Sequence, residues 1–196
     1  VKALSLDPAM RGWLDGGRSY IDPVNIGDVM RASGTGVVVE SRSDRWKPGD
    51  AVGGGLGIQR YAVIPERHLE PIDLSLASFE RWLGVLGVPG MTAWFGLLDV
   101  GALKEGESVV VSAASGAVGA LAVQIARLKG CPVVGIAGGP EKCRYVVEEL
   151  GADACIDYKA GDVRAQVSAA LPKGIDVYFD NVGGEILEAM MTLLRR

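Results

Sequence analysis

The stretch that decides the fold is SVVVSAASGAVGALAVQIARLKG, residues 108–130. Residues 108–113 form an apolar run that predicts a buried β-strand, and residues 117–129 place apolar side chains at helical spacing. Gly130 then provides a natural end for the helix. Gly116 and Gly119 lie in the segment that joins the strand to the first turn of the helix. A strand, a glycine loop and a helix in this order predict the first βα unit of a doubly wound sheet.

The same alternation continues to the end of the sequence. Further strands are predicted over 132–137, 154–158 and 174–180, and helices over 140–150, 162–171 and from near Gly184. Strands that alternate with helices favour a parallel sheet covered by helices on both faces. A doubly wound nucleotide domain normally has two further strands. We therefore expect an α/β protein with an incomplete Rossmann-type sheet, and a chain that is a fragment.

The first part of the sequence has a different character, with short apolar runs separated by Gly, Pro and Asp. Strands are predicted over 35–41, 50–55 and 60–65, with turn chemistry in the Lys-Pro-Gly-Asp segment at 47–50. This pattern predicts a small, mostly β domain. We place the boundary between the two domains at residue 80, so that the domains span residues 1–80 and 81–196.

Composition and charge exclude several classes of protein. The net charge is −4, and no run of like charge provides the basic patch that nucleic-acid binding requires. No apolar stretch reaches the roughly 18 residues of a membrane span. The three cysteines include no CxxC pair and the chain has one histidine, so we expect no zinc site. An odd number of cysteines is typical of a reducing compartment, which predicts a cytoplasmic protein.

The glycine loop predicts a phosphate-binding site. Gly116 allows a pyrophosphate to approach the backbone, and Gly119 allows the helix to pack closely on the strand. The N-terminus of the helix adds unpaired N–H groups and a partial positive charge. Ala114 stands where the GxGxxG pattern has its first glycine. The alternative is a tight βα turn that binds no ligand.

The end of the second strand indicates which nucleotide is bound. NAD-specific folds carry an Asp or Glu there, whereas this strand ends in Ala-Gly-Gly, with Gly138 and Gly139 leaving room for a 2′-phosphate. Lys142 supplies a positive charge shortly afterwards, which favours NADPH. The alternative is that Lys142 is an ordinary solvated lysine. Asn181 follows the fourth strand at the ligand-binding end of the sheet, although an ordinary Asn-Gly turn is the alternative there.

Four separated motifs, in order, resemble the medium-chain dehydrogenase/reductase superfamily. They are LSLDPAMRGW (4–13), the segment from VPGMTAW through the glycine loop to GGPEKC (88–143), IDYK (156–159) and YFDNVGGE (178–185). The sequence is most similar to the zinc-independent alkenal/one oxidoreductases, which include prostaglandin reductases, plant double-bond reductases and bacterial curcumin reductases. The resemblance covers nearly the whole chain.

The resemblance implies a fold, a cofactor and a set of site residues. Residues 1–80 would be part of a GroES-like catalytic domain, and residues 81–196 an NADP-binding Rossmann domain that is incomplete at its C-terminal end. The cofactor-binding residues would be Met91, Thr92, Ser115, Gly116, Ala117, Val118, Gly138, Lys142, Tyr158 and Asn181. Lys142 would contact the 2′-phosphate, and Tyr20 would assist proton transfer. A homodimer is a further expectation from the family.

The implied reaction is the NADPH-dependent reduction of the carbon–carbon double bond of α,β-unsaturated ketones and aldehydes. Hydride added to the β-carbon leaves an enolate, so donors must stabilise the carbonyl oxygen and a proton must reach the α-carbon. Tyr20 is a hydrogen-bond donor at neutral pH, although it could instead be a surface tyrosine. Two alternatives remain open: an NADPH quinone oxidoreductase, and a non-catalytic nucleotide-binding fragment.

Overall fold

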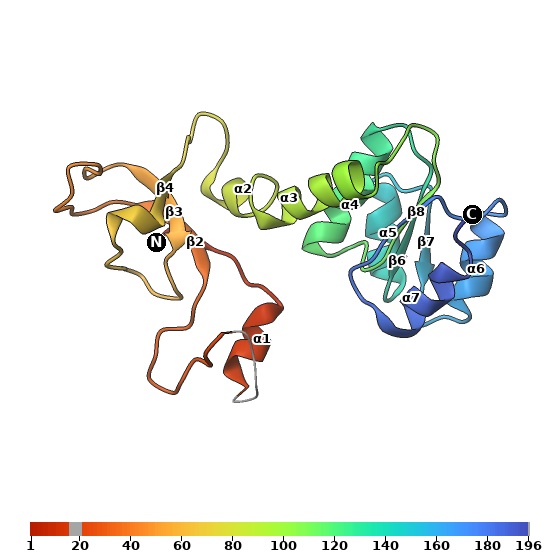
Figure 1. Cartoon of the computed structure of the whole chain (residues 1–196), viewed down its shortest axis with the longest axis horizontal. Coiled ribbons are helices and arrows are strands. Elements are labelled where there is room, and N and C mark those ends of the chain that lie inside the picture. Colours follow the sequence, from red (N-terminus) through yellow and green to blue (C-terminus); the bar gives the residue numbers. More distant parts are fainter. Residues whose placement is uncertain (16–20, 196) are drawn as a thin grey trace. The chain divides into compact units, whose positions relative to one another are not determined.

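The computed structural model describes residues 1–15 and 21–195 and contains two compact units, Val1–Val88 and Pro89–Arg196 (Figure 1). The division falls eight residues beyond the boundary we predicted at residue 80. Each unit has its own sheet. An α/β fold with a parallel sheet that follows a β-rich unit is confirmed.

The first unit is built on a four-stranded antiparallel sheet. Its strands, in the order β1-β2-β3-β4, are Ala3–Leu4, Ser33–Val37, Ala51–Gly55 and Leu69–Pro71. Short helices accompany the sheet: α1 (Ala9–Leu14), η1 (Glu66–His68) and α2 (Phe79–Leu83). The buried core consists of Trp46, Val52, Leu56 and Leu69.

The strand predicted over 60–65 is wrong. These residues form no strand, and the side chains of Tyr61 and Val63 are exposed. The place beside β3 that such a strand would take belongs to β4, whose Leu69 pairs with Gly54. The alternating apolar residues at 60–65 therefore favoured a strand, but a later segment, β4, forms the hydrogen-bonded pairing with β3.

The second unit contains a four-stranded parallel sheet in the order β7-β6-β5-β8. The strands are β5 (Val109–Val111), β6 (Val133–Ala137), β7 (Ala154–Asp157) and β8 (Val177–Phe179). All four predicted strands of this part are confirmed, with β5 and β8 shorter than expected. The first strand in sequence lies between the second and the fourth, so the strand order reverses between β5 and β8. Ligands of doubly wound sheets bind at this reversal.

Helices cover both faces of the parallel sheet, as predicted (Figure 1). One face packs against α4 (Ala117–Leu128) and α5 (Pro140–Glu148), and the other against α6 (Val163–Ala170) and α7 (Gly184–Met191). The valines of β5 show why a continuous apolar run was needed: Val109 and Val111 point to the first face and Val110 to the second, and all three are fully buried. Helix α3 (Val88–Phe95) continues into the π-helical segment η2 (Gly96–Val100), and η2 contributes buried Leu97 to the first face.

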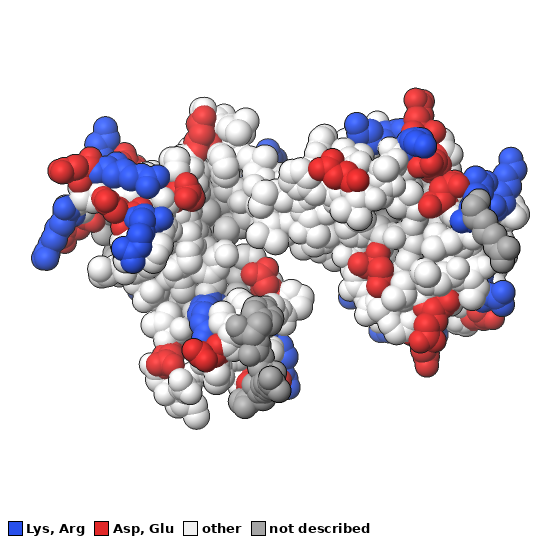
Figure 2. Space-filling model, in the orientation of Figure 1, with Lys and Arg blue, Asp and Glu red and all other residues white. Residues whose placement is uncertain are grey.

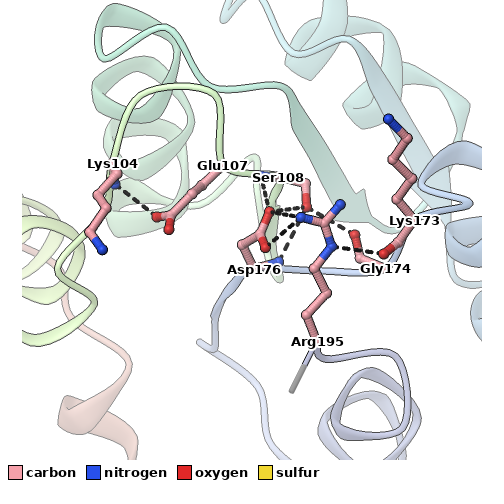
Figure 3. Close-up of polar contacts among 7 residues, drawn as sticks. All are labelled: Lys104, Glu107, Ser108, Lys173, Gly174, Asp176 and Arg195. Carbon is pink, nitrogen blue, oxygen red and sulfur yellow. Dashed lines mark hydrogen bonds and ion pairs between the residues drawn. The ribbon is translucent and has the colours of Figure 1, made fainter.

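A polar network joins β5 and β8 at the amino edge of the sheet (Figure 3). The Ser108 amide donates to Asp176 Oδ2 at 2.8 Å, and Arg195 Nη1 donates to Asp176 Oδ1 at 2.8 Å. Arg195 Nε also donates to the Lys173 carbonyl at 2.8 Å. Burial opposes ionisation of Asp176, but the bonds from Ser108 and Arg195 hold its pKa below the ordinary value.

We expect Asp176→Asn to lower the free energy of unfolding by about 1–3 kcal/mol near neutral pH, because it removes charge-assisted hydrogen bonds. Since folding lowers the pKa of Asp176, its contribution is present above the unfolded value of about 4 and is lost as the pH falls through the folded value. Urea unfolding of both proteins across a pH series measures the difference. A difference that stays constant down to low pH would rule out this account of the network.

Candidate functional site

The loop that follows β5 is a tight turn that aims the start of α4 at the carboxyl edge of the sheet. Ala113 has a positive φ of 45°, which is unusual for a residue with a side chain. The Gly116 amide donates to the Ala113 carbonyl at 2.8 Å and closes the turn. Gly116 is the N-cap of α4, and both Gly116 and Ala117 are exposed. The first amides of α4 therefore point toward an accessible edge, as phosphate binding requires.

Gly119 has a packing role that only glycine can fill. A Cβ atom at this position would lie 2.3 Å from the Ala113 carbonyl oxygen and 3.0 Å from Ala114 Cα. The first of these distances is far shorter than a van der Waals contact between two such atoms. At Gly116 the corresponding approach to the Ala113 oxygen is 3.1 Å. The predicted close packing at Gly119 is confirmed, although its partners, Ala113 and Ala114, lie in the loop that follows β5 and not in the strand itself.

Ser112, which our reading of the sequence missed, connects the glycine loop to the end of β8. Its side chain is fully buried, and its hydroxyl donates to Asp180 Oδ1 at 3.0 Å and accepts from the Asn181 amide at 2.7 Å. Asn181 Nδ2 donates to the Ser112 carbonyl at 2.8 Å. These bonds fix Asn181 at the point where the strand order reverses. A serine at the end of an apolar run was the available signal.

Asp180 orders the turn that leads into α7. Its carboxylate accepts from the Tyr178 hydroxyl at 2.8 Å, the Gly183 amide at 3.0 Å and the Val182 amide at 3.2 Å. Desolvation opposes the charged form, but these bonds and the one from Ser112 together keep the pKa of Asp180 below the ordinary value. Burial, helped by the bond to Asp180, raises the pKa of Tyr178. At neutral pH the pair is therefore a carboxylate and a neutral phenol, which suits a structural role.

The ends of β6 and β7 form a second part of the site. Tyr158 lies directly against Gly138, where an added Cβ would come within 2.8 Å of the tyrosine ring. Asp157 Oδ1 accepts from the Gly139 amide at 2.8 Å and from the Lys159 amide at 3.0 Å, and these bonds lower its pKa. Gly138 thus gives the tyrosine ring room to lie against the backbone, and about half of the tyrosine remains exposed.

Lys142 lies in the first turn of α5, immediately beyond this corner. Its side chain is exposed, and neither of the ion pairs found among the described residues includes it. The helix has its N-cap at Gly139, whose φ of 98° is in the range that favours glycine. An unpaired cation near a helix N-terminus is suited to binding an anion.

Most of the predicted cofactor residues lie along one edge of the sheet. Because the strands are parallel, the residues that follow β5, β6, β7 and β8 all emerge at the carboxyl edge. These residues are Ser115, Gly116, Ala117, Val118, Gly138, Lys142, Tyr158 and Asn181. Tyr20, the predicted catalytic residue, lies outside the described part of the chain.

Met91 and Thr92, two further residues of the predicted cofactor site, lie on α3. They are the fourth and fifth residues of this helix, which begins at Val88. Both side chains are exposed.

Figure 2 shows Lys and Arg intermingled with Asp and Glu on the face that it draws. Across residues 1–15 and 21–195, no cluster of three or more His, Cys, Asp or Glu side chains could hold a metal ion. Within the same residues, no helix combines the length and apolar character needed to cross a membrane.

Comparison with known proteins gives two family matches and several close relatives. One family model, described as the N-terminal domain of oxidoreductase, matches residues 1–72, and another, described as zinc-binding dehydrogenase, matches residues 117–196. The NADPH-dependent curcumin reductase of Escherichia coli K12 is 49% identical over 191 residues, which is 97% of this chain and 55% of the relative. The NADP(+)-dependent 2-alkenal reductase of Nicotiana tabacum is 39% identical, over 98% of this chain and 57% of the relative.

A solved structure shows the same fold. The crystal structure of CurA from Vibrio vulnificus in complex with NADPH is 44% identical and superimposes with a TM-score of 0.89, over 97% of this chain and 57% of that one. The chain thus spans little more than half the length of these relatives. The strand order, the glycine loop after β5 and these similarities all indicate the same family. The chain belongs to the medium-chain dehydrogenase/reductase family.

Proposed function

We propose that this chain binds NADPH at the carboxyl edge of its parallel sheet, and that the protein reduces the carbon–carbon double bond of α,β-unsaturated ketones and aldehydes. The observation that carries the proposal is the edge itself, where the exposed start of α4 and the unpaired Lys142 follow neighbouring strands. The similarity to an NADPH-dependent curcumin reductase and an NADP(+)-dependent 2-alkenal reductase supports it.

The residues present suit both phosphate groups of the cofactor. The amides of Ala117, Val118 and Gly119 belong to the first turn of α4, where amides have no partner within the helix, and they would hold the pyrophosphate. Lys142 would hold the 2′-phosphate, while Gly138 and Tyr158 would line the adenosine pocket. Ser115 and Asn181 would contact the cofactor on the two sides of the strand reversal, and Met91 and Thr92 would face it from α3.

The cofactor would supply the hydride that is added to the β-carbon of the substrate. The protein must then stabilise the negative charge on the carbonyl oxygen and deliver a proton to the α-carbon. We assign the proton delivery to the Tyr20 hydroxyl, because a phenol is protonated at neutral pH and can donate. Hydrogen-bond donors take the place of a zinc ion in this proposal, which is therefore a zinc-independent mechanism.

We also propose that the protein works in the cytoplasm. All three cysteines are free thiols, which suits a reducing compartment and supports a cytoplasmic location. The homodimer expected from the family stays a prediction.

The reaction is tested by offering the full-length protein an enone, an enal and a quinone, each with NADPH, and following the consumption of the cofactor. We expect the enone and enal to be turned over with a much larger kcat/KM than the quinone. A preference for the quinone would replace this proposal with a quinone oxidoreductase. Cofactor binding without turnover of any of the three would leave a nucleotide-binding protein.

The assignment of Lys142 is tested separately. Lys142→Ala should weaken NADPH binding roughly ten- to hundredfold, because a charge-assisted hydrogen bond of about 1.5–3 kcal/mol is lost. NADH binding, which involves no 2′-phosphate, should change little. Lys173→Ala is a matched control, since this lysine is exposed and precedes β8 at the opposite edge of the sheet. Equal weakening of NADPH and NADH binding by Lys142→Ala would argue against 2′-phosphate recognition by this residue.

A further inference from the structure

Two of the three cysteines lie in contact with one another, at a place that the proposed reaction does not use. Cys155 Sγ lies 3.1 Å from Cys143 Sγ. Cys143 belongs to the first turns of α5, and Cys155 is on β7, the strand against which α5 packs. Both thiols are free and both side chains are half-buried. The third thiol, Cys131, is fully buried, and it lies against the Lys104 carbonyl at 3.2 Å.

The separation of the two sulfur atoms is close to what a covalent bond between them requires. A disulfide has a sulfur–sulfur distance of about 2.05 Å, so the two atoms need to approach by only about 1 Å. Cys155 is the inner partner, because its sulfur lies 3.4 Å from the place where a Cβ on Gly135 would be, inside the packed face of the sheet. Cys143, the outer partner, is on α5.

The surroundings of Cys143 and Cys155 differ, and this difference assigns a distinct role to each thiol. Cys155 donates its S–H to the Cys143 sulfur. Burial, and secondarily this hydrogen bond, raise the pKa of Cys155, so it remains a thiol. Cys143 is the acceptor, and it is the fourth residue of α5, near the N-terminus of that helix. Cysteines that react with electrophiles are often found near helix N-termini. The arrangement places Cys143 as the attacking sulfur and Cys155 as the resolving one.

We propose that Cys143 and Cys155 form a redox site that a hydroperoxide converts into an intramolecular disulfide. Cys143 sulfur attacks the terminal peroxide oxygen, the oxygen–oxygen bond breaks, and an alcohol or water leaves, so that Cys143 becomes a sulfenic acid. The Cys155 sulfur then attacks the sulfenic sulfur, the sulfur–oxygen bond breaks, and water leaves. The two thiols give up two electrons and two protons, which the hydroperoxide takes up. A dithiol reverses the change by thiol–disulfide exchange.

The position of this pair connects it to the proposed cofactor site without depending on it. Cys143 follows Lys142 directly, and β7, which carries Cys155, ends one residue before Tyr158. A disulfide would tie the helix that carries the lysine to the strand that precedes the tyrosine. The oxidation itself requires no cofactor, so it can be measured whether or not NADPH binds.

The experiment exposes the purified chain to hydrogen peroxide and then measures free thiols, intact mass and the cross-linked peptides. We expect two of the three thiols to be lost together, the mass to fall by two hydrogen atoms, and one peptide pair to join residues 143 and 155. Treatment with dithiothreitol should restore the starting mass. Cys131→Ser, the matched control, should form the same cross-link.

Cys143→Ser should abolish the loss of two hydrogen atoms and leave Cys155 reduced, with circular dichroism confirming that the variant is folded. The proposal is overturned if the unmodified sequence gains oxygen atoms on Cys143 without cross-linking, or if it forms only disulfides between chains. It is also overturned if the three thiols resist peroxide equally. Because these outcomes are read on the unmodified sequence, they do not depend on the folding of any variant.

Discussion

Gly119→Ala is expected to destabilise the parallel-sheet unit by about 3 kcal/mol, at the upper end of the range for an overpacked interior. The added methyl group would lie 2.3 Å from the Ala113 carbonyl oxygen, and a backbone atom cannot move aside as a side-chain tip can. The helix must therefore shift away from the loop that follows β5, and the amides at the start of α4 shift with it. Denaturant unfolding followed by circular dichroism measures the loss, and NADPH binding should fall with it.

The matched control adds the same methyl group where there is room. A Cβ on Gly12, in α1, would have no atom within 4 Å. Alanine favours a helix over glycine by up to about 1 kcal/mol, so Gly12→Ala should be neutral or slightly stabilising. If the two variants unfold at the same denaturant concentration, the close contact at Gly119 does not constrain this fold.

Tyr20→Phe is expected to reduce turnover of an enone by about a hundredfold or more, the usual contribution of a positioned proton donor. The substitution removes one hydroxyl and keeps the ring, so the affinity for NADPH should be unchanged. The reduction should appear in kcat and in kcat/KM alike, because the proton is delivered in the transition state. Steady-state kinetics of the full-length protein, together with a cofactor titration, give both quantities.

Tyr61→Phe provides the control for the loss of a tyrosine hydroxyl. Tyr61 is largely exposed and belongs to the segment that was wrongly predicted to be a strand. We expect its replacement to leave turnover unchanged. Unchanged turnover in Tyr20→Phe as well would exclude Tyr20 as the proton donor. The proton would then come from a hydroxyl of the cofactor or from another donor.

The parallel sheet could be predicted because its signals are local. Each strand is a short apolar run, each helix starts or ends near glycine or proline, and the two alternate without interruption. The valines of β5 are buried on both faces of the sheet, so the strand is a continuous run of apolar residues, which is easy to recognise in the sequence. The same reasoning located the glycine loop and the residues after each strand.

The first unit was harder to predict because strand pairing is decided over long distances. Residues 60–65 have strand-like character, yet β3 pairs instead with Leu69–Pro71. The three-residue strand β4 and the six-residue helix α1 are too short to show a periodic pattern. The β-strand propensity of residues 60–65 favoured a strand there, but tertiary packing selected β4 as the partner of β3.

Several site features were hidden for a related reason. Ser112 contacts Asp180 and Asn181, which lie almost seventy residues away in the sequence, so its role depends on β5 and β8 being neighbours. The contact between Cys143 and Cys155 depends in the same way on how α5 packs on β7. The sequence shows such residues, but only the fold shows that they meet.

We expect the carboxyl edge of this sheet to recognise NADPH through its 2′-phosphate. The most direct measurement is a titration of the chain with NADPH and then with NADH, which differ only in that phosphate, followed by quenching of its four tryptophans. We predict that NADPH binds at least tenfold more tightly than NADH, and that this preference weakens as salt screens the charge of Lys142. Equal affinity for the two, or tighter binding of NADH by the folded chain, would contradict the claim.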